Sequence, residues 1–422
     1  MAEPTLRPFA RRLEPVLTRL LAEEPVVAVH GPRTVGKSTM VRALAALDGR
    51  RIIDLDDPET RDAVDASPSA FAAGESPVFI DEYQHAPAIL DAIKAELNRD
   101  LRPGRFVLTG STRYSSLPTA AQSLTGRLHV VTLWPLSQGE IDGTEERFAE
   151  RLLADPATLV TPTASPTSRE EYVDRILRGG FPLAVARPSG ASRNRWFDDY
   201  LDLVVERDVA ELSSIRQREK MPRLVARLGG QTAQVLNVAR VAADVGIESS
   251  TAEHYVRLLE AAFVIHRLPA WGTTLRARAS SKPKIHFVDS GVAGRMLRVT
   301  GSRLSAAQPQ AMTELGHLLE TFCVGEVLKQ VSWMGTPAQP GHWRTHDGDE
   351  VDLVLERDDG AIVGIEVKAG ERVRDADFRS LRKLRDAFGA RFLGGVVLHL
   401  GRHAYTHDDR LHALPVDCLW LR

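Results

Sequence analysis

A phosphate-binding pattern lies near the start of the 422-residue chain. It fits G-x-x-x-x-G-K-[ST], and it stands between an apolar run at 26–29 and a helical pattern at 40–47. Backbone N–H groups of such a loop turn toward phosphates, and the next helix N-terminus adds partial positive charge. The lysine reaches the terminal phosphates and the following hydroxyl holds Mg²⁺. We therefore expect a site for ATP and Mg²⁺ formed by Gly31, Pro32, Arg33, Thr34, Val35, Gly36, Lys37, Ser38 and Thr39.

Two acidic residues stand at the end of an apolar strand expected at 77–81, and they supply what hydrolysis needs beyond phosphate binding. Asp81 is expected to hold Mg²⁺ from its second coordination shell, and Glu82 to polarise the attacking water. The alternative is an acidic pair at a strand end with no catalytic role. The phosphate-binding loop upstream favours the catalytic interpretation.

Two further positions could act on the terminal phosphate. The run at 105–109 leads into Ser111, where a hydroxyl could sense the γ-phosphate, although Ser111 and Thr109 could equally cap the next turn. Arg127 follows Gly126 just before another apolar run, and an arginine there could reach the nucleotide of a neighbouring subunit. Its alternative role is a helix-terminal cation facing the helix dipole.

The order of these motifs, followed by Trp134-Pro135-Leu136-Ser137, resembles an AAA+ superfamily ATPase. More narrowly, the chain resembles a bacterial and archaeal family in which this ATPase precedes a C-terminal domain of unknown function. The matching segments cover nearly the whole chain. The resemblance implies a five-stranded ATPase sheet and assembly into homo-oligomers. The segments that carry the second part are Gly179–Pro182, Arg207-Asp208, Lys282–Gly291 and Glu366–Lys368.

A second set of residues that could do chemistry lies near the C-terminus. Asp359-Gly360 separates two apolar runs and predicts a hairpin. Asp352 and Glu366 each lie seven positions from residue 359, so they should face one another, with Lys368 on the same face as Glu366. Glu320, on an upstream helix, could complete the cluster.

This cluster resembles the PD-(D/E)xK nuclease motif. That resemblance implies that Asp352 and Glu366 bind Mg²⁺, that Lys368 positions the attacking water, and that Glu320 assists the metal or orients Lys368. The alternative is a retained fold that binds DNA or only packs, with its carboxylates neutralised by Lys368 and nearby arginines.

The middle of the chain contains a candidate DNA-binding element. Helical patterns at 236–247 and 249–260 are joined at Gly246, and Val264–Leu268 could begin a wing. Between Arg207 and Arg303 there are 16 Lys and Arg against 8 Asp and Glu, whereas the whole chain has a net charge of −2. A basic middle part favours DNA as a partner. Packing against neighbouring domains is the alternative for this helix pair.

The remaining composition narrows the class of protein. The two cysteines, Cys323 and Cys418, exclude a disulfide framework and indicate a reducing compartment. No apolar run approaches the ~20 residues that span a membrane, so we expect a cytoplasmic protein with no membrane partner.

The apolar and helical patterns predict a multidomain α/β chain with a parallel P-loop sheet, a helical and winged-helix-like middle, and an α/β restriction-endonuclease-like C-terminal domain. The ATPase strands are expected at 25–30, 51–55, 77–81, 105–109 and 129–134, and later strands at 285–288, 351–356, 361–367 and 393–400. The expected divisions are an N-terminal helix at 1–22, the AAA+ domain at 23–140, a linker at 141–169, a helical region at 170–235, a winged-helix-like module at 236–275, a basic connector at 276–310 and the nuclease-like domain at 311–422.

Three functions fit these features. The first is an ATPase whose nucleotide state controls binding, and possible metal-dependent cleavage, of DNA. The second is a switch without nuclease activity that binds DNA or a protein partner. The third is an ATPase that remodels proteins.

Overall fold

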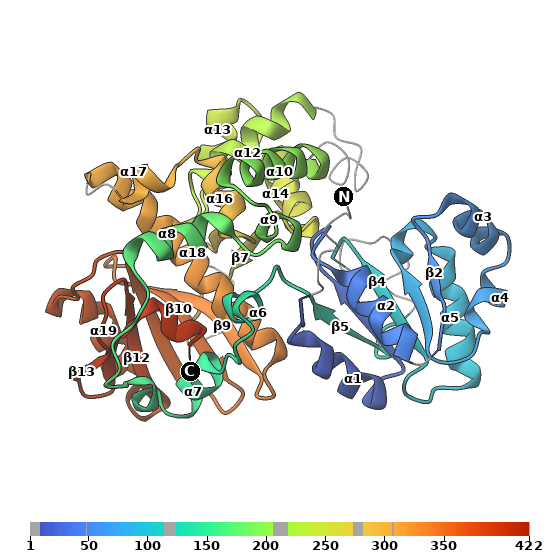
Figure 1. Cartoon of the computed structure of the whole chain (residues 1–422), viewed down its shortest axis with the longest axis horizontal. Coiled ribbons are helices and arrows are strands. Elements are labelled where there is room, and N and C mark those ends of the chain that lie inside the picture. The colour runs from blue at the N-terminus through green and yellow to red at the C-terminus, as the bar shows by residue number, and fades with distance from the viewer. Residues whose placement is uncertain are drawn as a thin grey trace.

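The computed structural model describes residues 9–47, 49–113, 124–205, 218–272, 282–305 and 308–421. Three parts follow one another along the chain: an ATPase part, a mainly helical middle part, and a C-terminal part built on a mixed sheet (Figure 1). This is the multidomain α/β class expected from the sequence. Arg207-Asp208, which contributed to the family resemblance, lies outside the described residues.

The ATPase part is a five-stranded parallel sheet in the order β2-β3-β4-β1-β5. Buried, mostly apolar central strands with intervening helices favour this arrangement, because helices cover both faces of a parallel sheet. The expected strands are present. Their bounds are β1 Val26–His30, β2 Ile52–Asp54, β3 Val78–Asp81, β4 Phe106–Gly110 and β5 Leu128–Thr132.

Helices α1 to α5 surround this sheet, at Leu13–Glu23, Lys37–Leu47, Pro58–Ala66, Pro68–Ala72 and Ala88–Arg99. The helix expected over 1–22 begins only at Leu13 in the described residues. The preceding residues instead contact Glu140, whose Oε1 accepts from the Arg12 backbone N–H at 2.7 Å and from Arg11 Nε at 3.1 Å. The residues just before Leu13 therefore contact a carboxylate far away in the sequence instead of forming a further turn of α1.

The segment expected as a linker at 141–169 is only partly loop. It contains α7 at Phe148–Ala154, followed by a 3₁₀ turn at Pro156–Leu159. Phe148, Leu152 and Leu153 are buried in the core that also holds the C-terminal part. These apolar residues have helical spacing and form a helix, although the residues after them have a composition typical of turns.

The middle part joins a helix pair to a small sheet. Helix α13 (Val238–Val245) and helix α14 (Ser249–Ala261) meet at Gly246, which has φ 76°, so the expected helix-turn-helix is confirmed. Strands β6 (Gln234–Val235), β8 (Lys284–Phe287) and β7 (Ile265–Leu268) form a three-stranded sheet in that order. Residues on both sides of the expected boundary at 275/276 therefore share one sheet.

The other middle helices are α8 Arg169–Arg178, α9 Pro182–Val185, α10 Gly190–Leu203, α12 Met221–Gly229, α16 Ser290–Met296 and α17 Gly301–Ser305.

The C-terminal sheet has the order β13-β14-β12-β11-β10-β9 and packs against the long helix α18 (Pro309–Trp333) and helix α19 (Arg379–Phe388). Leu353 pairs with Ile365 across the β10–β11 hairpin, so Asp352 and Glu366 are placed opposite one another as expected. The strands are β9 Ala338–Arg344, β10 Glu350–Arg357, β11 Ile362–Lys368, β12 Phe392–His399, β13 Tyr405–Asp408 and β14 Leu411–Pro415.

One apolar core is shared by the middle and C-terminal parts, and includes Leu259 of α14, Phe322 of α18 and Val396 of β12. A separate apolar core lies between the C-terminal sheet and α19, and includes Leu381 and Leu384. The two faces of the ATPase sheet have separate apolar cores. Across the described residues, no helix combines the length and the apolar character needed to cross a membrane.

Candidate functional site

The loop between β1 and α2 has the backbone geometry that phosphate binding requires. Gly36 has φ 99° and Thr34 has φ 61°, both in the left-handed region. A Cβ on Gly31 would lie 2.2 Å from the carbonyl oxygen of Leu133. Only glycine therefore fits at residue 31, and Gly36 takes a conformation that other residues rarely adopt.

Lys37 is the first residue of α2, and its side chain is buried beneath this loop. Its Nζ donates to the carbonyl oxygens of Gly31 at 3.1 Å and Pro32 at 3.0 Å, and lies 3.6 Å from Glu82 Oε1. Burial lowers the pKa of Lys37, while the charge of Glu82 opposes that shift. The ammonium group is thus held between the loop and the acid that follows β3.

Asp81, at the end of β3, lies beside the first turn of α2. Its Oδ1 accepts a hydrogen bond from the Thr109 hydroxyl. Burial raises the pKa of Asp81, and hydrogen bonds from Thr109 and Ser38 counteract the rise. The structure therefore brings Ser38 and Asp81 together, and a hydroxyl and a carboxylate are the hard oxygen groups that suit Mg²⁺.

Glu82 has φ 52° and turns its carboxylate toward β4. Its Oε2 accepts from the Ser111 backbone N–H at 3.1 Å and from Gln84 Nε2 at 2.5 Å. Burial would raise the pKa of Glu82, but Lys37 and the hydrogen bond from Gln84 hold the pKa below its usual value. The carboxylate is ionised at neutral pH, as a general base must be.

Ser111 is connected to the same network. Its hydroxyl accepts from Gln84 Nε2 at 3.0 Å, and Thr109 Oγ1 accepts from the Glu82 backbone N–H at 3.0 Å. The expected sensor position thus contacts the expected general base directly.

A cavity of about 520 Å³ opens beside the phosphate-binding loop. Phe9, Ala10 and Leu136 line it together with Pro182 and Leu183 of α9. The second family motif, Gly179–Pro182, therefore contributes to the wall of the expected nucleotide site. An apolar wall opposite a phosphate loop suits the base and ribose of a nucleotide.

Arg127 lies away from this cavity. The residue after it, Leu128, pairs with Val26 at the start of β1, whereas the phosphate-binding loop follows the other end of that strand. Arg127 is half-buried, and its NH1 donates to Asn98 Oδ1 at 2.7 Å. Arg127 thus lies at the N-terminal ends of the parallel strands, whereas the expected nucleotide site of its own subunit lies at their C-terminal ends.

The C-terminal cluster contains a residue that the sequence did not suggest. Lys284 Nζ lies 2.7 Å from Glu320 Oε1 and 2.9 Å from Asp352 Oδ1, and it also forms an ion pair with Glu350. Burial raises the pKa of Glu320 well above its usual range, with Asp352 adding to the shift and Lys284 opposing it. Among the described residues, no group of three or more His, Cys, Asp or Glu is placed to hold a metal ion.

Glu366 and Lys368 form a separate pair in this cluster, on β11. Burial, followed by the charge of Asp352, raises the pKa of Glu366 to about 8. Both residues line a polar cavity of about 280 Å³ together with Asp377 and Arg379. The expected residues Asp352, Glu366, Lys368 and Glu320 are thus close together, but an ammonium group lies between Glu320 and Asp352.

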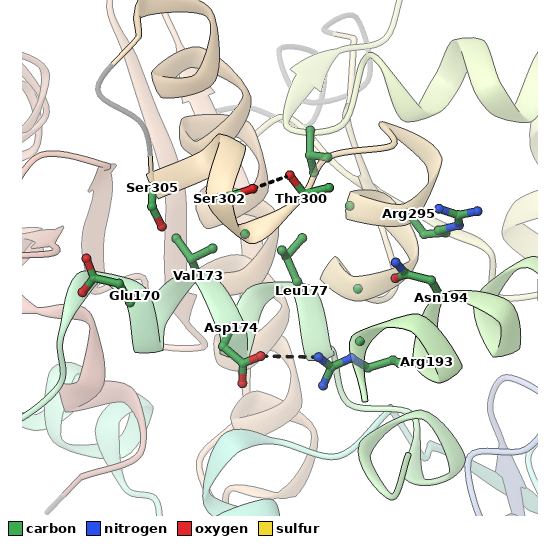
Figure 2. A pocket seen from close by; sticks show the side chains of 15 residues that line it. Glu170, Val173, Asp174, Leu177, Arg193, Asn194, Arg295, Thr300, Ser302 and Ser305 are labelled. Atoms are coloured by element: carbon green, nitrogen blue, oxygen red, sulfur yellow. Dashed lines mark hydrogen bonds and ion pairs between the residues drawn. The ribbon is translucent and has the colours of Figure 1, made fainter. Parts of the chain in front are cut away.

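A further cavity of about 490 Å³ lies among α8, α10, α16 and α17 (Figure 2). Arg193 there pairs with Asp174 at 3.4 Å across the two helices. The residues that line it include none of those expected to bind nucleotide or metal.

Several participating residues could not be identified from sequence motifs. Lys284 lies 36 positions from Glu320 and 68 from Asp352. The only feature of the sequence that could have identified Gln84 is its position two residues after Glu82. Arg11 NH1 donates to the Val35 carbonyl at 2.8 Å and so anchors the phosphate-binding loop from the N-terminal side. No local pattern distinguishes Arg11 from its neighbour Arg12.

Comparisons with known proteins match three successive segments of the chain, which correspond to the ATPase, middle and C-terminal parts. Residues 23–142 match the family model described as an AAA domain, residues 169–303 match a domain of unknown function (DUF8612), and residues 315–419 match another (DUF4143). Uncharacterized proteins of Mycobacterium bovis and Mycobacterium tuberculosis are each 27% identical over 403 residues, covering 95% of this chain and 82% of theirs.

Among solved structures, the Walker-type ATPase of Pyrococcus abyssi is 17% identical, with a TM-score of 0.42 over 71% of this chain and 99% of its own. The Thermotoga maritima RuvB Holliday junction branch migration motor is 18% identical, with a TM-score of 0.32 over 63% of this chain and 93% of its own. The family match and the loop geometry define the N-terminal part as an AAA-type P-loop ATPase domain. The resemblance of the C-terminal part to nucleases is not supported by these matches.

Proposed function

We propose that this protein is a Mg²⁺-dependent ATPase whose nucleotide state controls DNA binding by its middle part, without cleaving the DNA. One observation carries the proposal: the segment that follows β4, which contains Ser111, is hydrogen-bonded directly to the C-terminal end of helix α14. Arg113, two residues after Ser111, donates from its backbone N–H to the Ala261 carbonyl at 3.0 Å and from Nε to the Glu260 carbonyl at 2.9 Å. Its guanidinium also lies 4.8 Å from the centre of the Phe263 ring.

The residues of the ATP site divide the work of hydrolysis. Ser38 and Asp81 would hold Mg²⁺, which offsets charge on the phosphates when it is bound with ATP. Lys37 would donate to the terminal phosphates, and Glu82 would orient the attacking water and accept its proton. Because Glu82 contacts the Ser111 N–H, a change at the γ-phosphate would alter the segment that follows β4 and so reach Arg113.

Charge and exposure favour DNA as the partner of α14. Ser249, Ser250 and Arg257 are exposed on this helix, and the surrounding region is basic in sequence. Exposed hydroxyls at a helix N-terminus and an arginine can contact phosphates without reading bases. We therefore expect binding that depends on salt more than on sequence.

Cleavage is the less favoured alternative. It would require Mg²⁺ between Asp352 and Glu366, and the donor set does not fit because the Lys284 ammonium already pairs with Asp352, Glu320 and Glu350. Remodelling of proteins remains the alternative if DNA has no effect on hydrolysis.

Fluorescence anisotropy with labelled duplex and single-stranded DNA tests the proposal. Full-length protein should bind DNA with different affinity in ADP and in a non-hydrolysable ATP analogue, each with Mg²⁺. Arg113→Ala should retain ATP binding but make the two DNA affinities equal, whereas Arg257→Ala should weaken DNA binding in both states. Equal affinities for the unsubstituted protein would contradict the coupling, and absence of DNA binding would exclude DNA as the partner.

A further inference from the structure

We propose that Lys284 takes the position a divalent metal would occupy in the nuclease-like cluster, so that this cluster is a metal-independent ionic junction between the middle and C-terminal parts. The inference does not depend on the proposed ATP-controlled binding of DNA. It concerns four residues that come from three different elements: Lys284 of β8, Glu320 of α18, and Glu350 and Asp352 of β10.

Geometry gives the first argument. Lys284 Nζ is within hydrogen-bonding distance of Glu320 Oε1 at 2.7 Å and Asp352 Oδ1 at 2.9 Å, and it forms its third contact with Glu350. These are the distances of charge-assisted hydrogen bonds. A Mg²⁺ ion prefers oxygen ligands at roughly 2.0–2.1 Å, and it could not share the same space with an ammonium group. The lysine and a metal are therefore mutually exclusive occupants.

The position of Lys284 in the fold gives the second argument, because it shows that the lysine cannot simply swing away. Strand β8 is the central strand of the three-stranded sheet, and Lys284 pairs with Leu268 of β7 and Val235 of β6. Only 1% of the Lys284 side chain is exposed. Pairing on both sides holds the Lys284 backbone in place, and burial of the side chain keeps the ammonium among the three carboxylates.

The remaining carboxylate oxygens supply the third argument. Asp352 Oδ2 accepts from the Val367 backbone N–H at 2.9 Å, and Glu366 pairs with Lys368 on its own strand. Asp352 thus has a protein partner on each oxygen, and Glu366 has its own lysine. Asp352 therefore has no free oxygen for Mg²⁺, and of the two residues only Glu366 keeps a buried oxygen, Oε2, without a hydrogen-bond partner in the described part of the chain.

This arrangement assigns a structural role to residues that have the spacing of a nuclease motif. Lys284 belongs to the middle part, and its partners belong to the C-terminal part, so the cluster ties the two together beside their shared apolar core. A charge-neutralising lysine can preserve the packing of a carboxylate cluster while preventing metal binding.

Mn²⁺ titration followed by electron paramagnetic resonance tests this directly, using the full chain without nucleotide in a Lys37→Ala background. That protein and its Asp352→Asn variant should bind the same amount of Mn²⁺, because Asp352 holds no metal. An ion that binds to the first protein and is lost in Asp352→Asn would overturn the proposal. This comparison leaves Lys284 in place and so does not depend on the folding of a lysine variant.

Replacing the lysine provides the complementary test. Lys284→Ala should lower Tm by about 10 °C, because three carboxylates lose a buried partner. The variant should also gain one Mn²⁺ site. Added Mn²⁺ should then raise its Tm part of the way back to that of the unsubstituted protein. Lys282→Ala, two residues away and exposed, is the matched control and should change neither quantity. A folded Lys284→Ala protein that binds no additional Mn²⁺ would show that the lysine does not occupy a metal position.

Discussion

At the scale of single residues, the proposed ATP site contains one acid whose charge is controlled by its neighbours. Glu82 is buried, yet Lys37 and Gln84 keep its pKa below the usual value. The same carboxylate accepts a hydrogen bond from the backbone N–H of Ser111, the proposed sensor residue. Its protonation and its orientation are therefore both set by residues of the nucleotide site, which is the arrangement required of a general base.

Glu82→Gln should separate binding from hydrolysis. The amide retains the size and most hydrogen bonds of the carboxylate but cannot accept a proton, so kcat should fall by about 10²- to 10⁴-fold. Binding of a fluorescent ATP analogue should persist, and steady-state phosphate release measures kcat. Lys37→Ala is the contrasting variant, because it should weaken nucleotide binding itself. Full hydrolysis by Glu82→Gln would exclude Glu82 as the base.

A second buried acid predicts a dependence of stability on pH. Burial, followed by the charge of Glu326, raises the pKa of Glu146 to about 8, although Ser137 Oγ and the Gly139 N–H donate to it. Between its unfolded pKa and about pH 8, the folded protein binds more proton than the unfolded chain. Glu146 therefore favours the folded state at low pH, and this contribution is lost as pH rises toward 8.

Glu146→Gln should consequently flatten the fall in stability between about pH 5 and pH 8. Urea unfolding at a series of pH values measures the effect. Glu145→Gln is the neighbouring control, since Glu145 is exposed and pairs with Arg147. An unchanged pH profile in Glu146→Gln would show that Glu146 titrates normally in the folded protein.

At the scale of elements, the phosphate-binding loop is positioned by the strands beside it. Its first glycine fits against the Leu133 carbonyl, which immediately follows β5, and its last glycine precedes α2. The loop conformation is therefore determined jointly by its own glycines and by the packing of β1 against β5.

Gly31→Ala should disturb this loop, because the new Cβ would lie 2.2 Å from a backbone oxygen that cannot easily move. We expect at least about a tenfold loss of ATP affinity, measured by calorimetry, from a shift worth at least about 1.4 kcal/mol. The control is Gly316→Ala within α18, where a Cβ meets nothing within 4 Å. That substitution should leave ATP affinity unchanged and stabilise the fold by about 0.5–1 kcal/mol. Unchanged affinity in Gly31→Ala would mean that the loop adapts.

At the scale of the whole molecule, the ATPase part has its own apolar cores, whereas the middle and C-terminal parts share one. Contacts between these two units converge on residues beside the nucleotide site. The Gln138 backbone N–H donates to Glu326 of α18 at 2.8 Å, and Lys329 of the same helix donates to the Leu136 carbonyl at 3.0 Å. Leu136 lines the nucleotide cavity, so a change there has a direct route to the rest of the molecule.

Assembly of subunits is the remaining prediction at this scale. Arg127 and the nucleotide site of its own subunit lie at opposite ends of the parallel strands, so a catalytic role for Arg127 requires a neighbouring subunit. Arg127→Ala should bind ATP but hydrolyse it about 10³-fold more slowly, the lower end of the effect of an arginine finger.

Mixing Arg127→Ala with Lys37→Ala should restore part of the ATPase activity, because the second protein supplies the missing arginine to the intact site of the first. Arg99→Ala, which alters an exposed arginine that pairs with Glu96, should hydrolyse ATP normally. No recovery on mixing, or full activity of Arg127→Ala alone, would contradict a role in a neighbouring subunit.

Local patterns predicted most of the elements correctly. The five ATPase strands, the helix pair joined at Gly246 and the register of Asp352 opposite Glu366 are present. Expectations were less accurate where long-range contacts decide the outcome. The N-terminal helix begins at Leu13 because Glu140 binds the residues before it, and α7 lies in a segment whose later composition resembles a linker.

The sequence by itself determined the phosphate-binding loop, because its chemistry depends on consecutive residues whose backbone torsions and helix start are local properties. It also determined the pairing of Asp352 with Glu366, since a short hairpin defines its own register. Only the tertiary structure placed Lys284 among Glu320, Glu350 and Asp352, and Arg113 against α14. These contacts join segments far apart in the chain, and their formation depends on the packing of whole elements rather than on any local pattern.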